Sequence, residues 1–420
     1  MTNGNQHIPS GYKPSPLGPI PEDWEVKRLG EIGSFKNGLN FTPNEDGFSY
    51  HFLGVGDFQD KTDIHANELN QIRLENELDK DYHLKDDDLV FVRSNGSKSL
   101  VGRCIIIHAD HVKATYSGFC IRFRTTSEET STQYIKHIID AGYLQRFLQY
   151  EGRGTNITNL NQEILGRLTF PLPNLKEQQN ILNVLSLWDT AIAKQTALIE
   201  QLTLRKRGLM QQLLTGKKRL KGFSGEWKEV RLGEVAFVIG GGTPNTDISD
   251  YWNGDIPWFT PSEIGEHKYV NTSERTISEK GLNDSSAKLL PQGTILFTSR
   301  ATIGAKAILT TEATTNQGFQ SFVVNNENNN EFIYYYLDII LNEIKQKASG
   351  STFPEVSAES LRKILIKIPD NNEQNAIASV LVNADKEIEI QKQKLAAMQE
   401  QKKGLMKVLL TGKRRISHER

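Results

Sequence analysis

The chain carries one sequence pattern twice, and this internal repeat limits the possible folds more than any other feature. The segment Trp24–Ile32 returns as Trp227–Val235, with Trp, Arg, Leu, Gly and Glu kept in register. Farther along, Gly154–Arg219 and Gly350–Arg415 align without a gap. Because each copy of a repeat folds by the same rules, we expect two similar halves, each with a variable region followed by a uniform one.

Apolar runs suggest which residues of the two variable regions are equivalent. Leu89–Arg93 corresponds to Ile295–Arg300, so we interpret the two arginines that end these runs as counterparts. Ser117–Phe119 corresponds to Gln317–Phe319. These runs predict buried strands that lead into polar loops.

The uniform region predicts a long helix in each half. A capping-box pattern opens each copy and a glycine stands where the helix should end. These residues are Asn174-x-x-Glu177 with Gly216, and Asp370-x-x-Glu373 with Gly412.

Between these signals, the apolar positions follow the alternating spacing of three and four that is typical of a coiled coil. Gln195 with Gln391, and Lys206 with Lys402, interrupt the two seams at matching places, as polar register markers do. We therefore expect an antiparallel pair of helices, about 60 Å long at about 1.5 Å per residue, with a variable domain at each end. The alternative is that each helix packs on its own domain as an ordinary amphipathic helix. The seam positions are Leu185, Trp188, Ile192, Gln195, Ile199, Leu202, Lys206, Leu209 and Leu213, and then Leu381, Ala384, Ile388, Gln391, Leu395, Met398, Lys402, Leu405 and Leu409.

The charge balance excludes a chain that binds nucleic acid through bulk basic composition. There are 50 Lys and Arg against 51 Asp and Glu, a formal net charge of −1. A nucleic-acid surface must then come from local segregation of charge. Lys217–Arg219 and Lys413–Arg415 are matched basic clusters that would suit phosphates. No apolar run approaches the roughly 18 residues of a membrane span, so we expect a cytoplasmic protein without membrane contact.

The order of the motifs resembles the specificity subunit of type I restriction–modification systems. The resemblance rests on the Trp…Leu-Gly-Glu opening, the run Gly293–Gly304, the later Asn316-Gln-Gly318, the Ile-Pro-x-x-x-x-Gln start of a helix and its Leu-Leu-Thr-Gly-Lys end. It extends over about residues 12–415. It implies an α+β fold in which two pseudo-symmetric target-recognition domains are joined by two long helices that form an antiparallel coiled coil. The implied parts are an N-terminal arm (1–19), the first recognition domain (20–173), the first helix (174–216), a linker (217–226), the second recognition domain (227–369), the second helix (370–413) and a tail (414–420).

The same resemblance implies the function and the partners. Each recognition domain would read one half of a split, asymmetric site in double-stranded DNA, and the coiled coil would space the domains. Two modification subunits, which are methyltransferases, would flank the coil and bind S-adenosylmethionine. Restriction subunits, with ATP and Mg²⁺, would cleave the DNA. No cofactor is expected in this subunit itself.

Sequence motifs for catalysis are largely missing. The chain has no Asn/Asp-Pro-Pro-Tyr/Phe, no phosphate-binding Gly-x-x-x-x-Gly-Lys-Ser/Thr and no Gly-x-Ser-x-Gly. Asp370 with Glu400-x-Lys402 imitates a nuclease motif, but the last two residues fall in the middle of a predicted helix. His108-x-Asp-His111 offers two possible metal ligands, but a turn explains it and the sequence shows no third ligand. We therefore expect a non-catalytic subunit without a metal.

The candidate DNA-binding residues lie in polar loops after the buried strands. Arg, Lys, Asn, Gln, Ser and Thr are the side chains that bond phosphates and base edges, although loops are polar for other reasons as well. The tyrosines of Phe332–Tyr336 could stack on bases, but their helical spacing favours a core helix. The candidates are Arg93, Ser94, Asn95, Lys98, Thr155, Asn156, Thr260, Ser262, Arg300, Thr302, Asn316, Gln317, Ser351 and Thr352.

Three other functions stay open at this point. A nuclease or methyltransferase would cut DNA or bind S-adenosylmethionine as an isolated chain. A coiled-coil scaffold would show no sequence-selective DNA binding. A stand-alone DNA-binding regulator would bind its site tightly without methyltransferase partners.

Overall fold

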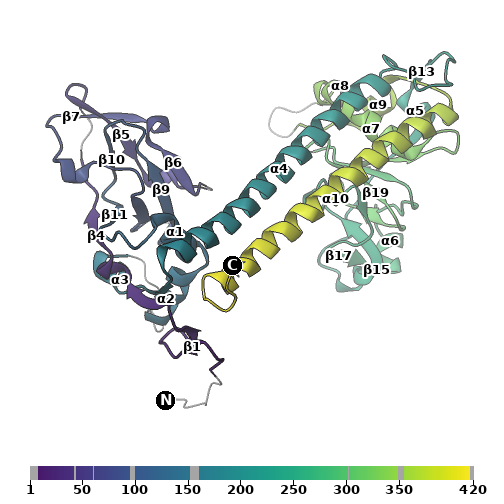
Figure 1. Ribbon diagram of the computed structural model, residues 1–420. Helices are drawn as coiled ribbons and strands as arrows, with labels where there is room; N and C mark the ends of the chain where they lie inside the picture. Colours follow the sequence, from purple (N-terminus) through teal and green to yellow (C-terminus); the bar gives the residue numbers. More distant parts are fainter. Residues whose placement is uncertain are drawn as a thin grey trace. The chain divides into compact units, whose positions relative to one another are not determined.

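The computed structural model describes residues 8–41, 44–59, 61–94, 100–151, 160–300, 302–348 and 354–416. The chain divides into two compact units. The first contains residues 1–194 and 395–420, and the second contains residues 195–394. Each unit therefore holds one recognition domain and part of both long helices (Figure 1).

The first unit is built on a five-stranded sheet in the order β4-β11-β8-β9-β6, in which β6 pairs parallel to β9 and the other neighbours are antiparallel. A three-stranded sheet, β10-β5-β7, and two pairs, β12-β3 and β1-β2, complete the strands. The strands are β1 (Tyr12–Lys13), β2 (Ile20–Pro21), β3 (Glu25–Arg28), β4 (Gly33–Asn37), β5 (Phe48–Leu53), β6 (Asp63–His65), β7 (Gln71–Leu74), β8 (Leu89–Val92), β9 (Cys104–His108), β10 (Ala114–Tyr116), β11 (Cys120–Thr125) and β12 (Thr169–Leu172). The helices of the domain are α1 (Thr132–Asp140), α2 (Tyr143–Glu151) and α3 (Gln162–Gly166), with short 3₁₀ turns that include η2 (Val55–Asp57).

The second unit repeats this topology. Its five-stranded sheet has the order β14-β21-β18-β19-β16, its three-stranded sheet the order β17-β15-β20, and β13 pairs with β22. The predicted repeat is thus confirmed for every sheet of the first unit except the β1-β2 pair. The strands are β13 (Lys228–Arg231), β14 (Ala236–Gly240), β15 (Trp252–Phe259), β16 (Tyr269–Val270), β17 (Arg275–Ile277), β18 (Ile295–Phe297), β19 (Lys306–Leu309), β20 (Thr314–Thr315), β21 (Gln320–Val324) and β22 (Leu365–Ile368). The helices are α5 (Leu232–Val235), α6 (Glu279–Asn283), α7 (Asn330–Ile339), α8 (Leu341–Gln346) and α9 (Ala358–Arg362), with the 3₁₀ turn η7 (Pro261–Glu263).

The continuous apolar runs of the sequence are central strands buried on both faces. In β8, Leu89 and Phe91 join one core cluster, while Val90 and Val92 join the cluster on the opposite face. Because successive side chains of a strand point to opposite faces, a strand between two cores has no polar positions. The equivalent strand β18 divides its side chains between two clusters in the same way. Phe332–Tyr336 lies in α7, where its first two and last two residues are buried, so the core interpretation of this segment is confirmed.

Two helices of 39 residues each, α4 (Leu175–Leu213) and α10 (Asn371–Leu409), form the uniform regions. Asn174 and Asp370 cap them as predicted, because each side chain accepts a hydrogen bond from the backbone N–H three residues on, at 2.9 and 3.0 Å. Gly216 and Gly412 follow the helix ends with positive φ of 68° and 70°, a conformation that glycine adopts without strain. None of the helices within the described residues is both long and apolar enough to cross a membrane.

The two helices pair antiparallel within each unit, and Figure 1 shows them side by side. In the second unit the Gln195 amide donates to the Gln391 side chain at 2.9 Å, which confirms these two residues as register markers. Lys206 pairs with Asp385 there, and Lys402 pairs with Asp189 in the first unit. The helix ends also join the domain cores. Leu185 and Leu409 belong to one core cluster of the first unit, and Leu213 and Leu381 to one of the second. The coiled-coil prediction is therefore confirmed, and packing on the domains accompanies it at the helix ends.

Candidate nucleic-acid interface

In the second unit, the loops that follow β15, β18 and β20 meet at one edge. The Asn316 N–H donates to the Phe259 carbonyl at 3.0 Å, which joins the loop after β20 to the end of β15. The Ser299 N–H donates to the Gly318 carbonyl at 2.8 Å, which joins the loop after β18 to the same place. Three loops that are distant in the sequence thus form one continuous surface.

Within this surface, the polar side chains divide into those that hold the loops and those that remain accessible. Asn316 accepts the Gly318 N–H through Oδ1 at 2.8 Å, and the Thr260 hydroxyl donates to Glu263 at 2.7 Å. Both residues are half-buried. Ser262 and Gln317 are exposed, and Gln317 accepts a hydrogen bond from the Thr243 hydroxyl. The accessible pair offers a hydroxyl and an amide for base or phosphate contact.

Arg300 is the cationic residue of this edge. Its side chain is 44% exposed, and its Nε lies 2.9 Å from Glu355 Oε2. A β-bridge between the same two residues holds the backbone. Because a guanidinium carries five N–H donors, a contact at Nε leaves others for a ligand. Thr302 is exposed nearby in the chain, and its carbonyl accepts the Thr298 hydroxyl at 2.6 Å.

The first unit has the corresponding edge. The Ser117 N–H donates to the Leu53 carbonyl at 2.9 Å, and the Arg93 N–H donates to the Phe119 carbonyl at 2.8 Å. Arg93 and Ser94 are half-buried at this edge. Asn95, Lys98, Thr155 and Asn156, and in the second unit Ser351 and Thr352, lie outside the described residues.

The backbone register corrects two equivalences that the sequence suggested. The Gly102 N–H donates to Val92 O, and the Gly304 N–H donates to Thr298 O, so Val92 and Thr298 are counterparts. Arg93 is then equivalent to Ser299, since both N–H groups bond the loop that follows the next strand. The interpretation of Arg93 and Arg300 as counterparts is therefore wrong. It aligned two arginines by allowing a one-residue gap that the strands do not contain.

The same register reveals a residue that the sequence did not single out. Phe119 is equivalent to Gly318, since the N–H of each donates to the side chain of the residue two before it. The match of Ser117–Phe119 with Gln317–Phe319 is therefore wrong by one residue. The Phe119 side chain is 56% exposed. A side chain at Gly318 would instead meet Pro261, since a Cβ built there lies 2.7 Å from the proline ring. The first unit thus exposes an aromatic ring where the second has none.

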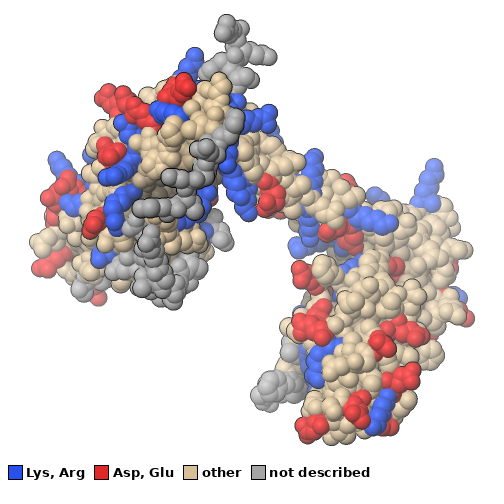
Figure 2. All heavy atoms as spheres, turned by 90° about the horizontal axis from the view of Figure 1, so that it is seen from below, with Lys and Arg blue, Asp and Glu red and all other residues tan. Residues whose placement is uncertain are grey.

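One arginine in each basic cluster at the helix ends forms an ion pair within the chain. Arg219 bonds Glu373 through Nε at 2.6 Å, and Arg415 bonds Glu177 through Nε at 3.0 Å. Both arginines therefore have a structural role, while Lys217, Lys218 and Lys413 are exposed. The expectation that these clusters suit phosphates stays a prediction. Figure 2 shows Lys and Arg interspersed with Asp and Glu on the face it presents.

The residues of the nuclease-like motif have structural roles. Asp370 caps α10 by accepting the Glu373 N–H, and Lys402 pairs with Asp189.

The histidine motif contributes one of its histidines to a larger group of side chains. Asp63 and His65 lie next to His108, and these three residues form a group that could hold a metal ion, while His111 is not a member of this group. A hydrogen bond with Asp110 raises the pKa of His65.

These features define a class of protein: a twice-repeated α+β recognition domain with two long antiparallel helices. The family model described as the type I restriction modification DNA specificity domain matches residues 21–204 and 224–400. The chain belongs to this family. As a specificity subunit it supplies DNA sequence specificity and is not itself the catalytic subunit.

Relatives and solved structures agree with this assignment. The MjaX specificity subunit of Methanocaldococcus jannaschii, a putative type I restriction enzyme component, is 26% identical over 421 residues, 96% of this chain and 97% of that one. The MjaIX specificity subunit of the same organism is 39% identical over 171 residues, 40% of each chain. The EcoR124I/EcoR124II specificity subunit of Escherichia coli is 29% identical over 244 residues, 54% of this chain and 57% of that one.

Two solved structures share the fold. A chain from a study of complex assembly and conformational transition in a type I restriction–modification system has a TM-score of 0.67 at 17% identity, and the match covers 94% of this chain and 99% of that one. The HsdS subunit from Thermoanaerobacter tengcongensis has a TM-score of 0.53 at 17% identity, with coverage of 94% and 98%.

Proposed function

We propose that the chain selects the DNA site of a type I restriction–modification complex, with each unit reading one half of a bipartite, asymmetric sequence. The observation that carries this proposal is a repeated framework with unlike residues at equivalent edge positions. Arg93 and Phe119 of the first unit correspond to Ser299 and Gly318 of the second. Equal frameworks with different surface chemistry are what two different half-sites require.

The accessible side chains set the chemistry of each half-site. In the second unit, Arg300 suits guanine, Gln317 suits adenine and Ser262 suits a base or a phosphate. In the first unit, Arg93 supplies the cation, and the exposed Phe119 ring suits an apolar contact with a thymine methyl group. Asn95, Lys98, Thr155, Asn156, Ser351 and Thr352 remain candidates in the loops that flank these edges.

The long helices would set the spacer between the half-sites and dock the methyltransferase subunits. Leu187 is 70% exposed, Leu204 63% and Ile390 60%, so these apolar side chains of α4 and α10 are accessible to such partners. Two modification subunits would bring S-adenosylmethionine, and restriction subunits would bring the ATP- and Mg²⁺-dependent cleavage. This chain would act on DNA within that assembly.

Domain exchange tests the proposal. Residues 20–173 are replaced by the same segment of another family member, and the chimera is expressed with its modification subunits. The exchanged piece includes both β3 and β12 because these strands pair with each other over four residues. Methylome sequencing should show one half-site changed and the other kept. Exchange of residues 227–369 should change the opposite half-site.

The control is the wild-type chain with the same modification subunits. Simultaneous change of both half-sites would contradict separate reading by the two units. Sequence-selective binding by the chain without modification subunits, at full affinity, would favour a stand-alone regulator instead.

A further inference from the structure

Two histidines and an aspartate meet at the edge of the five-stranded sheet in the first unit. Asp63 and His65 lie on the edge strand β6, and His108 ends the neighbouring strand β9. The parallel register places His65 directly opposite His108. Ile64, between the first two residues, is 1% exposed and points into the core, so Asp63 and His65 share the outer face.

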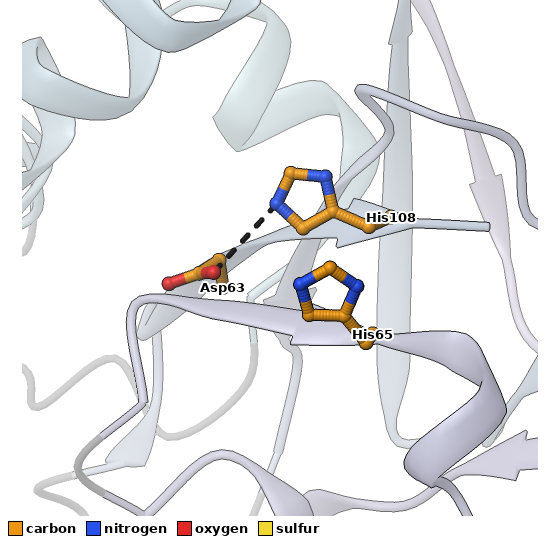
Figure 3. A group of neighbouring side chains, drawn as sticks. All are labelled: Asp63, His65 and His108. Atoms are coloured by element: carbon orange, nitrogen blue, oxygen red, sulfur yellow. Dashed lines mark ion pairs between the residues drawn. The ribbon is translucent and has the colours of Figure 1, made fainter. Parts of the chain in front are cut away.

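The three side chains face one another. His108 Nε2 lies 3.6 Å from Asp63 Oδ2, and the two imidazole rings stack with centroids 4.7 Å apart. One ligand atom of each residue lies within 4.8 Å of the others. Figure 3 shows both rings beside the Asp63 carboxylate, with a ring nitrogen of each on the side of that carboxylate.

A fourth residue orients His65. Its Nδ1 lies 3.1 Å from Asp110 Oδ1. When one imidazole nitrogen donates its proton to a carboxylate, the other is free to bind a metal, and this pairing is usual for metal-binding histidines. Asp110 is held in position by a turn in which it and His111 both have positive φ.

We propose that Asp63, His65 and His108 bind one divalent ion of the Zn²⁺ class. Two imidazoles and a carboxylate are a ligand set that Zn²⁺ accepts, with a fourth position left to water. Bonds of about 2.0–2.2 Å in a tetrahedral arrangement need ligand atoms roughly 3.3 Å apart. Because all three side chains are at least partly exposed, rotations about their own bonds can close the difference.

The second unit provides an internal comparison. Asp63 pairs with Ile106, and in the second unit Tyr269 pairs with Ile308, the counterpart of Ile106. The residues equivalent to the three ligands are therefore Tyr269, Asn271 and Thr310. This set lacks imidazole and carboxylate, so the ion is a property of the first unit and not of the shared framework.

The ion would tie an edge strand of three residues to the sheet. β6 contacts this sheet through β9 alone, and two of the ligands lie on β6 and one on β9. Asp63 and His108 also line a cavity that reaches Lys136 of α1, Asp189 of α4 and Lys402 of α10. The ion would thus stabilise the border of the domain that faces the helices of its own unit.

Calorimetric titration of the full chain with ZnCl₂, after treatment with chelator, tests the proposal. We expect one saturable site in the wild type, and binding at least tenfold weaker in His65→Ala and in His108→Ala. Asp110→Asn should weaken binding by about tenfold or more, as loss of a partner behind a ligand does. His267→Ala is the matched control, since this histidine is exposed and lies outside the group. It should bind as the wild type does.

Two further readouts keep the test decisive. Co²⁺ in place of Zn²⁺ should give the visible absorption of a tetrahedral site in the wild type and lose it in His108→Ala. Thermal unfolding in chelator should be the same for all variants, which shows that they fold, and added Zn²⁺ should raise the unfolding temperature of the wild type. The proposal is overturned if no saturable site is found, or if the His267→Ala variant loses as much binding as His65→Ala and His108→Ala.

Discussion

Glu373, in the first turn of α10, accepts two hydrogen bonds from the Arg219 guanidinium, although its side chain is only 1% exposed. The Trp227 indole donates to the same carboxylate at 3.3 Å. In the first unit, Glu177 binds Arg415 and Trp24 in the same way. In each unit, one buried carboxylate therefore joins the start of one long helix to the segment that follows the other long helix. It also joins both to the tryptophan that precedes β3 or β13.

Removing the arginine should destabilise the second unit. In Arg219→Ala the buried carboxylate of Glu373 keeps only the indole as a strong partner, so the variant should be clearly less stable than the wild type. Lys217→Ala, in the same basic cluster but exposed, should change stability by less than about 0.5 kcal/mol. Hydrogen exchange around β13 and the start of α10 measures the difference. Equal protection in both variants would show that the pair contributes no stability.

The glutamine pair should behave differently from an apolar seam position. Gln195 is 6% exposed and bonds both the side chain and the backbone carbonyl of Gln391. Gln391→Ala leaves the buried amide without its side-chain partner, which costs about 1–3 kcal/mol. The double variant Gln195→Leu/Gln391→Leu should be neutral or more stable, since neither amide is then left unpaired. Denaturant midpoints of the three proteins measure this. A double variant less stable than the single one would contradict it.

The long helices were predictable because their signals are local. Caps, terminal glycines and the alternating seam all lie within one stretch of chain, and the structure confirms them. The capping-box pattern also predicted that Glu177 and Glu373 bond the backbone at the start of their own helices. This prediction was wrong, since each carboxylate bonds an arginine and a tryptophan from distant segments instead. The sequence cannot show such a partner because the contact exists only after the units fold.

The site was harder to predict for a related reason. Which loop residues share an edge depends on strand register, and a one-residue gap in the alignment was enough to mispair Arg93 with Arg300 and to hide Phe119. The histidine group was missed because Asp63 and His65 reach His108 through parallel pairing of β6 with β9, over some forty residues of chain. Comparing the two copies strand by strand, without gaps, would have recovered the register from sequence.

Arg300 should contribute to reading the second half-site. Loss of a bidentate base contact in Arg300→Ala should weaken binding by about 1–3 kcal/mol without unfolding the unit, since the residue is 44% exposed. Titration of the assembled complex on one duplex, at matched salt, measures the change. If Arg300 contacts phosphate alone, the salt slope should fall by about one with no change in base preference. Equal affinity would remove Arg300 from the interface.

The two cysteines should be unreactive in the folded chain. Burial raises the pKa of Cys120 to about 12 and raises the pKa of Cys104 as well. Because the thiolate is the reactive form, a thiol reagent at pH 8 should modify neither residue in native protein and both after denaturation. Rapid modification of the native chain would mean that β9 or β11 opens readily, since these strands hold the two side chains.

The length of the helical pair should set the spacer of the recognised site. Ion pairs and core contacts lie on both sides of the Gln195–Gln391 pair. A longer rod therefore needs seven added residues in each helix, one heptad after Gln195 in α4 and one after Ile390 in α10. This arrangement keeps Gln195 opposite Gln391, Lys402 with Asp189, and Lys206 with Asp385. A heptad adds roughly 10 Å of helix, which at about 3.4 Å per base pair widens the spacer by one to three base pairs. Methylome sequencing should show the wider spacer with both half-sites unchanged.

The insertion in α4 alone serves as the control, and it should destabilise the chain because it moves Lys206 away from Asp385. Methylation at the original spacing by the doubly extended protein would mean that the partner subunits, and not the helices, position the two units on DNA.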